Sequence, residues 1–428
     1  MNKKLYIETY GCQMNVGDSE VIFSILAKEG YGRTEDISEA DVILANTCSV
    51  RDNAEQRIWG RLEQFHKQKE NRPQVVVGIV GCMAERLKDK LLETGKVDLV
   101  AGPDSYRTLP VLLRDVAPDK PQINVMLSHE ETYADIIPVR TDRNGVSAFI
   151  SIMRGCNNVC SYCVVPYTRG AERSRDPKTI VREACDLFSK GYKEVTLLGQ
   201  NVDSYLWKSP EGDVDFADLL AELDKIDGDY LLRFMSSQPK DASFKLFDTM
   251  ARSRHVAHQL HLPVQSGCDR VLRAMNRPYD VEKYLELITY ARRVMPELVL
   301  TSDVIIGFPG ETEAEAMETV ALVEKVRFDA LFTFIFSPRP GTPAARLPDP
   351  VPREEKQKWF DKLLEVQNGQ SAALHAAYIG KTVRVLVDGK SDDESFPLAS
   401  RTEGNRLVRD ARGKLSSCLF YNSDAADE

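Results

Sequence analysis

Apolar runs of strand length alternate with longer amphipathic segments over the first hundred residues. Three of these runs, KLYIETYGC, DVILANTC and VVVGIVGC, each stop at a small polar or glycine turn that carries a cysteine. Helices are predicted over residues 18–29 and 52–70, and each opens with an aspartate suited to capping. Alternating strands and helices predict a parallel sheet. Cys12, Cys48 and Cys82 should therefore lie together at its carboxyl edge, where such sheets bind ligands.

The pattern weakens after this region. A strand within residues 97–103 and a helix near 106–113 are expected to close an N-terminal domain, 1–114. Residues 115–143 contain three prolines, several acidic residues and no sustained period, so they are predicted to form a linker.

The alternation resumes in residues 144–377. Strands are predicted in the runs SAFISIMRG, EVTLLGQNV, LLRFMSS, HQLHLPVQS, LVLTSDVIIGFPG and ALFTFIFSP. Helices are expected at residues 177–190, 281–294, 313–326 and 353–377. Six strand–helix units predict a partial (β/α)6 barrel with its chemistry at the carboxyl-end loops. The overall fold class is thus α/β, with an N-terminal parallel sheet domain, a central barrel and a small C-terminal β domain, 378–428. The last twenty residues of the β domain, RDARGKLSSCLFYNSDAADE from 409, show no further strand.

Composition narrows the class of protein. A chain of 428 residues is too long for one core, and its nine cysteines, an odd number, make a disulfide framework a poor explanation. Eighteen consecutive apolar residues occur nowhere, so neither secretion nor membrane spanning is expected and the cytoplasm is the expected location. A net charge of -9 argues against a surface coated in positive charge, but a local basic patch can still bind phosphates.

Cys156, Cys160 and Cys163 follow the first predicted barrel strand with the spacing C-x3-C-x2-C. One short loop with three thiolates can hold three corners of a [4Fe–4S] cube and leave the fourth iron open. This arrangement is typical of radical S-adenosylmethionine (SAM) enzymes, in which SAM chelates the open iron and is cleaved to a 5′-deoxyadenosyl radical. The alternative is a zinc loop with a distant fourth ligand, although structural zinc sites usually pair two Cys-x2-4-Cys motifs.

The three N-terminal cysteines form a second candidate cluster site. A single cysteine at a strand end is more often a small core residue than a ligand, but three at the same topological point favour ligands. They would again leave one iron free, here for an exogenous sulfur. Cys185 is predicted to pack on a helix face, and Cys268 and Cys418 have no assigned role.

The segments YGCQMN, NTCSVRDNAEQR, GCMAER and RGCNNVCSYCVVPYTRGAERSR closely resemble the methylthiotransferases, and within them the MiaB-type tRNA enzymes. The resemblance extends from Tyr6 to about Val408. It implies a cluster domain, a radical SAM barrel and a small RNA-binding TRAM domain. It also implies the reaction, which adds a methylthio group at C2 of N6-isopentenyladenosine at tRNA position 37. Two SAM molecules would be used per turnover, and the N-terminal cluster would supply the sulfur.

The resemblance and strand-end positions together suggest cofactor contacts. Polar residues near predicted strand ends are expected to bind the amino acid, ribose and adenine parts of SAM; they are Gln200, Asn201, Ser236, Ser237, Gln265, Ser266 and Asp303. Ordinary helix-capping residues are the alternative. Arg169, Arg173 and Arg175 are expected to pair with the SAM carboxylate or RNA phosphate, Arg173 being the selected SAM contact, unless they form a solvated turn. The segment LRAMNRPYD is expected to shape the adenosine site.

The expected partners are the tRNA anticodon stem-loop with N6-isopentenyladenosine, an unidentified reductant and a cluster-repair system. No membrane partner is expected, and the protein is expected to be a monomer. Two alternatives share the chemistry: a ribosomal-protein aspartate methylthiotransferase and a threonylcarbamoyl-adenosine tRNA methylthiotransferase. A third is a non-catalytic iron–sulfur carrier, which would normally close its clusters with four thiolates.

Overall fold

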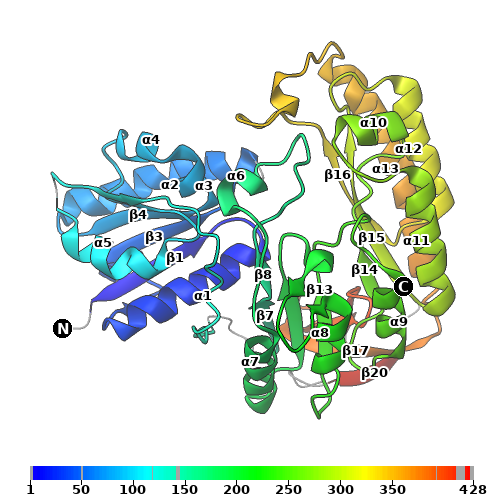
Figure 1. Cartoon of the computed structure of the whole chain (residues 1–428), viewed down its shortest axis with the longest axis horizontal. Helices are drawn as coiled ribbons and strands as arrows, with labels where there is room; N and C mark the ends of the chain where they lie inside the picture. Colours follow the sequence, from blue (N-terminus) through cyan, green and yellow to red (C-terminus); the bar gives the residue numbers. More distant parts are fainter. Residues whose placement is uncertain are drawn as a thin grey trace. The chain divides into compact units, whose positions relative to one another are not determined.

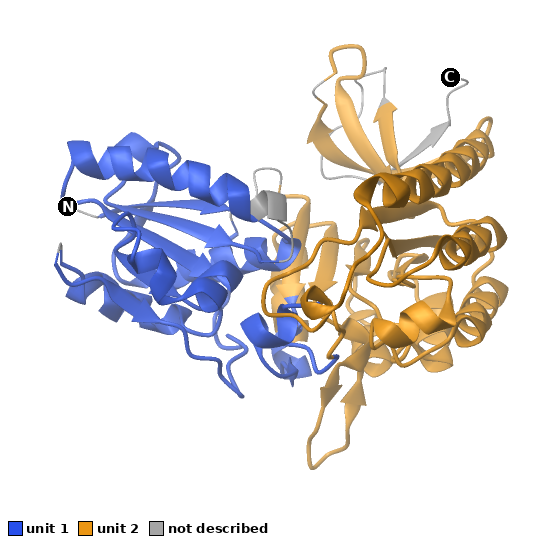
Figure 2. Cartoon of the chain, turned by 90° about the horizontal axis from the view of Figure 1, so that it is seen from above, with its two compact units in different colours: residues 1–141, 151–158, 163–179 blue, residues 142–150, 159–162, 180–428 orange. Residues whose placement is uncertain are grey.

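The computed structural model describes residues 3–49, 52–117, 119–140, 145–391, 393–410 and 420–424. The chain forms two compact units (Figure 2). The first unit comprises residues 1–141 together with 151–158 and 163–179, whereas the second comprises 142–150, 159–162 and 180–428. Much of the predicted cluster loop, although it follows the first barrel strand, therefore belongs to the first unit. In the described part of the chain, no helix has the length and apolarity needed to cross a membrane.

A six-stranded parallel sheet forms the centre of the first unit (Figure 1). Its order is β2-β1-β3-β4-β5-β6, with bounds β1 (Lys4–Thr9), β2 (Gly32–Arg33), β3 (Val42–Thr47), β4 (Val76–Gly81), β5 (Leu99–Ala101) and β6 (Gln122–Asn124). The helices are α1 (Gln13–Lys28), α2 (Asp52–Asn71), α3 (Cys82–Leu87), α4 (Asp89–Leu92) and α5 (Leu109–Asp115). One apolar cluster includes residues of α1 and α5, and another includes residues of α2, α3 and α4, so both faces of the sheet are covered. The predicted parallel sheet is confirmed.

Two local predictions for this unit are wrong. Helix α1 begins at Gln13 because Cys12 occupies the N-cap, and its backbone N–H donates to Asn15 Oδ1 (3.4 Å). Asp18 therefore lies inside the helix and is buried instead of capping it. The expected linker, 115–143, contributes strand β6 beside β5, a strand of three residues that is too short to show a period.

The six predicted barrel strands are all present in the second unit, in two three-stranded sheets. One sheet has the order β13-β10-β7, with β7 (Ser147–Ser151), β10 (Glu194–Leu198) and β13 (Leu231–Phe234); the other has β14 (Gln259–His261), β15 (Val299–Ile306) and β16 (Ala330–Ile335) in sequence order. A parallel bridge from Leu232 to Val256 links the region of β13 to the segment before β14. The helices are α7 (Pro177–Ser189), α8 (Phe216–Leu223), α9 (Phe244–Arg252), α10 (Asp269–Ala274), α11 (Val281–Val294), α12 (Glu313–Val326) and α13 (Arg353–Ala376). The partial barrel is confirmed.

A four-stranded antiparallel sheet follows α13, with the order β19-β18-β17-β20. Its strands are β17 (Thr382–Lys390), β18 (Leu398–Thr402), β19 (Leu407–Asp410) and β20 (Phe420–Asp424). Strand β20 pairs with β17, which corrects the expectation that the tail adds no strand. Cys418 lies outside the described residues, and Cys185 is exposed instead of packed.

A buried ion-pair group joins this small sheet to the barrel within the second unit. Glu194, the first residue of β10, accepts hydrogen bonds from Arg233 Nε (2.6 Å) and Arg401 Nη2 (2.9 Å). Arg401 also donates to Asp388 (2.6 Å). Burial alone would raise the pKa of Glu194, but the attraction of the two guanidinium groups outweighs burial and lowers it.

Glu194→Gln should lower the free energy of unfolding by about 3 kcal/mol, because it leaves the buried Arg233 guanidinium without its carboxylate and takes one of two carboxylate partners from Arg401. The folded-state pKa of Glu194 lies below the ordinary value of 4.5. The stabilisation is therefore present above pH 4.5 and is lost as pH falls through the folded-state pKa. Anaerobic urea unfolding at neutral and acidic pH measures this difference. Glu222→Gln is the surface control; equal effects of the two changes would contradict the assignment.

Candidate cluster and cofactor sites

The three N-terminal cysteines follow three neighbouring strands. Cys12 comes three residues after β1, Cys48 directly follows β3, and Cys82 directly follows β4 as the first residue of α3. Parallel strands bring these points to one edge of the sheet. Cys48 and Cys82 are buried and Cys12 is exposed.

These thiols share one electrostatic environment. A hydrogen bond with Cys48, aided by the charge of Arg169, lowers the pKa of the Cys12 thiol to about 6. Burial raises the pKa of Cys82, while Arg169 opposes that change by donating from Nε to Cys82 Sγ (3.2 Å). A nearby cation stabilises the thiolate, which is the form that binds metals.

The donor set fits a [4Fe–4S] cluster. Among the described residues, no group of three or more His, Cys, Asp or Glu side chains is arranged to hold a single metal ion. A cube makes a different demand, because each thiolate binds its own iron and the sulfurs need not converge on one point. Three cysteines at one edge, one of them with a lowered pKa and one beside a cation, satisfy that demand.

Gly11 leaves room for this arrangement. Its φ is 130°, and a Cβ placed there would lie 2.3 Å from Cys48 Cβ and 2.8 Å from Asn15 Oδ1. The residue before Cys12 must therefore be glycine for the turn to pack against Cys48.

We expect Gly11→Ala to remove most iron from the N-terminal site, since the new methyl group displaces Cys48 and strains the turn. Iron and sulfide analysis after anaerobic reconstitution should show the loss of about half of the bound iron, the share of one of two cubes. Gly17→Ala is the matched control, because a Cβ there meets nothing within 4 Å. Full iron retention by Gly11→Ala would contradict this role of the turn.

The second cysteine motif lies in a loop closed by a short antiparallel pair, β8 (Met153–Arg154) and β9 (Arg173–Ser174). The Cys156 N–H donates to Gly170 O (3.0 Å). Gly155 has φ 78°, and a Cβ there would lie 1.9 Å from Ala171 O. These contacts fix the start of the loop. The short helix α6 (Val165–Arg169) follows Cys163.

Cys160, which belongs to the second unit, is buried beside a guanidinium group. Arg277 Nη1 donates to Cys160 Sγ (3.4 Å), while its other nitrogens donate to Pro263 O (3.0 Å) and Tyr279 Oη (2.8 Å). Arg277 lies within the segment LRAMNRPYD, whose expected role was at the adenosine. The structure shows a contact of Arg277 with a cysteine sulfur, and the role of the segment at the adenosine stays a prediction.

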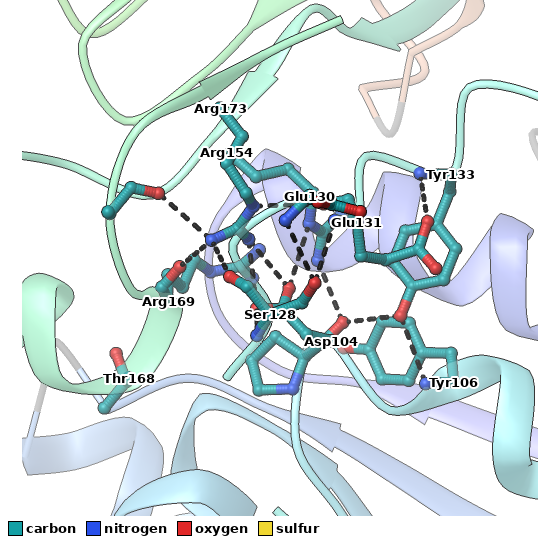
Figure 3. Close-up of polar contacts among 12 residues, drawn as sticks. Asp104, Tyr106, Ser128, Glu130, Glu131, Tyr133, Arg154, Thr168, Arg169 and Arg173 are labelled. Atoms are coloured by element: carbon teal, nitrogen blue, oxygen red, sulfur yellow. Dashed lines mark hydrogen bonds and ion pairs between the residues drawn. The ribbon is translucent and has the colours of Figure 1, made fainter. Parts of the chain in front are cut away.

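The arginines after the cysteine loop are buried in polar networks of the first unit (Figure 3). Arg173 donates to both carboxylate oxygens of Asp104 (2.9 and 3.0 Å) and to the Ser128 carbonyl (2.8 Å). Arg175 donates to Thr179 Oγ1 (2.9 Å). The alternative prediction, that these arginines form a solvated charged turn, is therefore wrong. The contact of Arg173 with SAM stays a prediction, and the hydrogen bonds named here lie within the protein.

Gln200 and Asn201 follow β10 and present unsatisfied polar atoms. Gln200 Oε1 and Asn201 Oδ1 are buried, and neither has a hydrogen-bond partner in the described part of the chain. Ser236 (φ 72°) and Gln265 (φ 69°) lie shortly after β13 and β14 in a strained backbone conformation. Unsatisfied polar atoms and backbone strain often mark a binding site, so this strand-end region fits a polar cofactor such as SAM.

The other three predicted SAM contacts differ in setting. Ser237 is buried, and its hydroxyl donates to Asp203 Oδ1 (3.0 Å). Ser266 is fully buried and accepts from the Cys268 N–H (3.2 Å), which is a structural role within the loop. Asp303 lies inside β15, an eight-residue strand, and its carboxylate is 3.5 Å from His261 Nε2. The expectation that Asp303 ends a strand is wrong. Their contacts with SAM stay predictions.

Several residues of these networks were missed by sequence reasoning: Asp18, Asp104, Arg154 and His261. No local signal marks the first three, because their partners are distant in the sequence; Asp18 and Arg154 are 136 residues apart. His261 could have been noticed as a polar residue within an apolar barrel strand.

Comparison with known proteins defines the class. Residues 4–102 match the profile described as "Uncharacterized protein family UPF0004", and residues 150–323 match that of the Radical SAM superfamily. A radical SAM methyltransferase, TsrM from Kitasatospora setae, has a similar solved structure, with a TM-score of 0.59, 13% identity, and coverage of 81% of this chain and 77% of that one. At this identity the likeness concerns the fold. The class is that of radical SAM enzymes.

The curated relatives identify the particular family. A tRNA-2-methylthio-N(6)-dimethylallyladenosine synthase of Bacteroides fragilis is 49% identical over 98% of this chain and 93% of its own length. The protein of the same name from Amoebophilus asiaticus is 48% identical over 95% of this chain and 87% of its length. The chain belongs to the family of tRNA-2-methylthio-N(6)-dimethylallyladenosine synthases.

Proposed function

We propose that this protein transfers a methylthio group to C2 of N6-isopentenyladenosine at position 37 of tRNA by radical SAM chemistry. Two separate cysteine triads carry this proposal. One follows three neighbouring strands of the N-terminal sheet, and the other lies in the loop after the first barrel strand. Each triad leaves one corner of a cube without a protein thiolate. The curated relatives bear the name of this reaction.

Different residues of the chain would bind the two clusters and SAM. Cys156, Cys160 and Cys163 would hold the cluster that chelates SAM, and the N-terminal triad would hold the cluster that supplies sulfur. When bound, the clusters and SAM supply the electron, the hydrogen abstraction and the methyl group that polar side chains cannot supply. Arg277 donates a hydrogen bond to Cys160 Sγ, and Gln200 and Asn201 offer buried acceptors to the amino and hydroxyl groups of SAM.

The barrel also offers a surface for the base. Phe332 and Phe334 lie on the same face of β16, and their side chains are 49% and 39% exposed. The His261 ring meets Phe332 edge-on, with centroids 5.7 Å apart. Exposed aromatic rings stack on unpaired bases, and an isopentenyl group adds apolar surface for them to cover. We assign these rings to the flipped adenosine.

The remaining proposals concern partners. The substrate is the anticodon stem-loop carrying N6-isopentenyladenosine, and the sheet β17–β20 acts as a TRAM-like domain that grips the RNA. A separate reductant and a repair system restore the clusters. The protein works as a monomer in the cytoplasm. The division of the second unit into a barrel, 144–377, and a small β domain, 378–428, rests on the sequence pattern, whereas the N-terminal domain extends beyond residue 114 because β6 pairs with β5.

Nucleoside mass spectrometry of tRNA tests the function. Cells without the gene should accumulate N6-isopentenyladenosine and lack its 2-methylthio derivative, and the wild-type gene should restore the derivative. A Cys160→Ala gene is the matched control and should not restore it. Unchanged tRNA together with loss of a methylthio group from a ribosomal protein, or from threonylcarbamoyl-adenosine, would favour the related enzymes instead.

A further inference from the structure

The strongest unassigned feature is the side chain of Arg169, which is buried in the first unit beside the N-terminal cysteines. Its Nη2 donates to Asp18 (2.8 Å) and its Nε to Cys82 Sγ (3.2 Å). Its Nη1 is buried and has no hydrogen-bond partner among the residues that the structure describes. An unsatisfied charged donor in such a place is costly, so a ligand that accepts from it is expected.

The charges around Arg169 point to an anion. Arg154, Arg169 and Arg173 are buried with Asp18 and Asp104 in one connected group. Figure 3 labels the three arginines and Asp104. Three guanidinium groups face two carboxylates, so the carboxylates of this group do not balance its arginines. A buried cation needs a counter-charge, and the only member of the group that these contacts place against a cysteine sulfur is Arg169.

The chemistry of the cysteine triad indicates which class of anion would bind beside Arg169. A cube held by three thiolates has one iron for an external ligand, and sulfur anions are the ligands that such iron prefers. A guanidinium group presents its N–H donors in a rigid fork. In Arg169, Nη2 donates to Asp18 and Nε donates to Cys82 Sγ. These two hydrogen bonds fix the plane of the guanidinium group, so the N–H groups of Nη1 point in a defined direction.

We propose that Arg169 is a positioning residue whose Nη1 hydrogen-bonds an external hydrosulfide or thiolate anion at the N-terminal cysteine triad. This inference rests on the proposed function, because it assigns Arg169 to the sulfur that becomes the methylthio group. Arg169 thus contacts a cysteine ligand and the external sulfur, and it retains that sulfur until transfer.

The test measures anion binding instead of turnover. The full chain carrying Cys160→Ala is reconstituted anaerobically and reduced, so that only the N-terminal cluster contributes a spectrum. Sodium methanethiolate is then titrated while the electron paramagnetic resonance signal is recorded. Arg169→Lys keeps the charge beside Asp18 but loses the fork, and we expect it to raise the dissociation constant by about 10- to 100-fold.

Arg154→Lys is the matched control. Arg154 shares Asp18 with Arg169 (2.8 Å for each) and is equally buried, but its hydrogen bonds go to Asp18 and to Pro103 O. The Arg154→Lys variant should bind methanethiolate with an affinity close to that of the parent protein. Unchanged affinity in Arg169→Lys would overturn the proposal, and so would an equal loss in Arg154→Lys, which would make the role of Arg169 merely structural.

Circular dichroism and iron content show whether the Arg169→Lys variant folds and retains iron. If it does not, a second measurement on the parent protein tests the proposal. Electron–nuclear double resonance of the parent with isotopically labelled arginine should show a new nitrogen coupling when methanethiolate binds. Absence of that coupling would overturn the proposal. If methanethiolate binds as expected but tRNA is never modified, the proposed function fails and the anion site remains.

Discussion

Cys160→Ala should abolish reductive cleavage of SAM. The reason is that the proposed loop cluster would lose one of its three thiolate ligands, the one whose sulfur accepts a hydrogen bond from Arg277 (3.4 Å). We expect formation of 5′-deoxyadenosine to fall by more than about 100-fold, beyond the usual effect of losing a group that only supports a metal ligand. The measurement is anaerobic incubation with SAM and a strong reductant, followed by chromatography.

Cys185→Ala is the control for the loss of a thiol. Cys185 is exposed on α7 and lies outside both triads, so its replacement should leave SAM cleavage unchanged. If the Cys160→Ala protein still produced 5′-deoxyadenosine at the wild-type rate, this loop would be excluded as the site of the radical cluster.

Cys48→Ala should separate the two halves of the reaction. The proposed N-terminal cluster would lose a ligand that is buried and hydrogen-bonded to Cys12, while the loop cysteines and the polar residues after β10 are untouched. SAM cleavage should persist without coupling to product, and the 2-methylthio nucleoside should fall by more than about 100-fold. Both products are measured in one reaction with isopentenylated tRNA.

Cys268→Ala controls for the replacement of a buried cysteine. Cys268 packs in an apolar cluster of the second unit with Val271 and Phe308. Its loss should affect stability more than the ratio of the two products. Full methylthiolation by the Cys48→Ala protein would contradict the division of labour between the triads.

Most of the fold could be predicted because its elements are long and periodic. Helices α11 and α12 have the predicted bounds, and the cysteines follow β1, β3 and β4 as predicted. Strands β6 and β20 could not be predicted, since three or five residues with many polar positions show no period. Their place is set by pairing with strands elsewhere in the chain.

The site was predictable in its ligands and less so in their surroundings. Spacing and strand ends identified the six cysteines as candidates, because a local pattern carries both signals. The aspartate at 18 reads locally as a helix cap, yet the turn at Cys12 starts the helix earlier and leaves Asp18 to bind Arg154 and Arg169. Partners more than a hundred residues apart are determined by tertiary packing, which a local pattern does not contain.

Mössbauer spectroscopy of the anaerobically reconstituted protein, loaded with isotopically enriched iron, tests the central claim most directly. The wild-type protein should contain two [4Fe–4S] clusters, and SAM should shift the signal of one iron in only one of them. The protein lacking Cys12, Cys48 and Cys82 should keep the SAM-responsive cluster alone. A single cluster in the wild-type protein, or a SAM response lost with the N-terminal cysteines, would contradict the account.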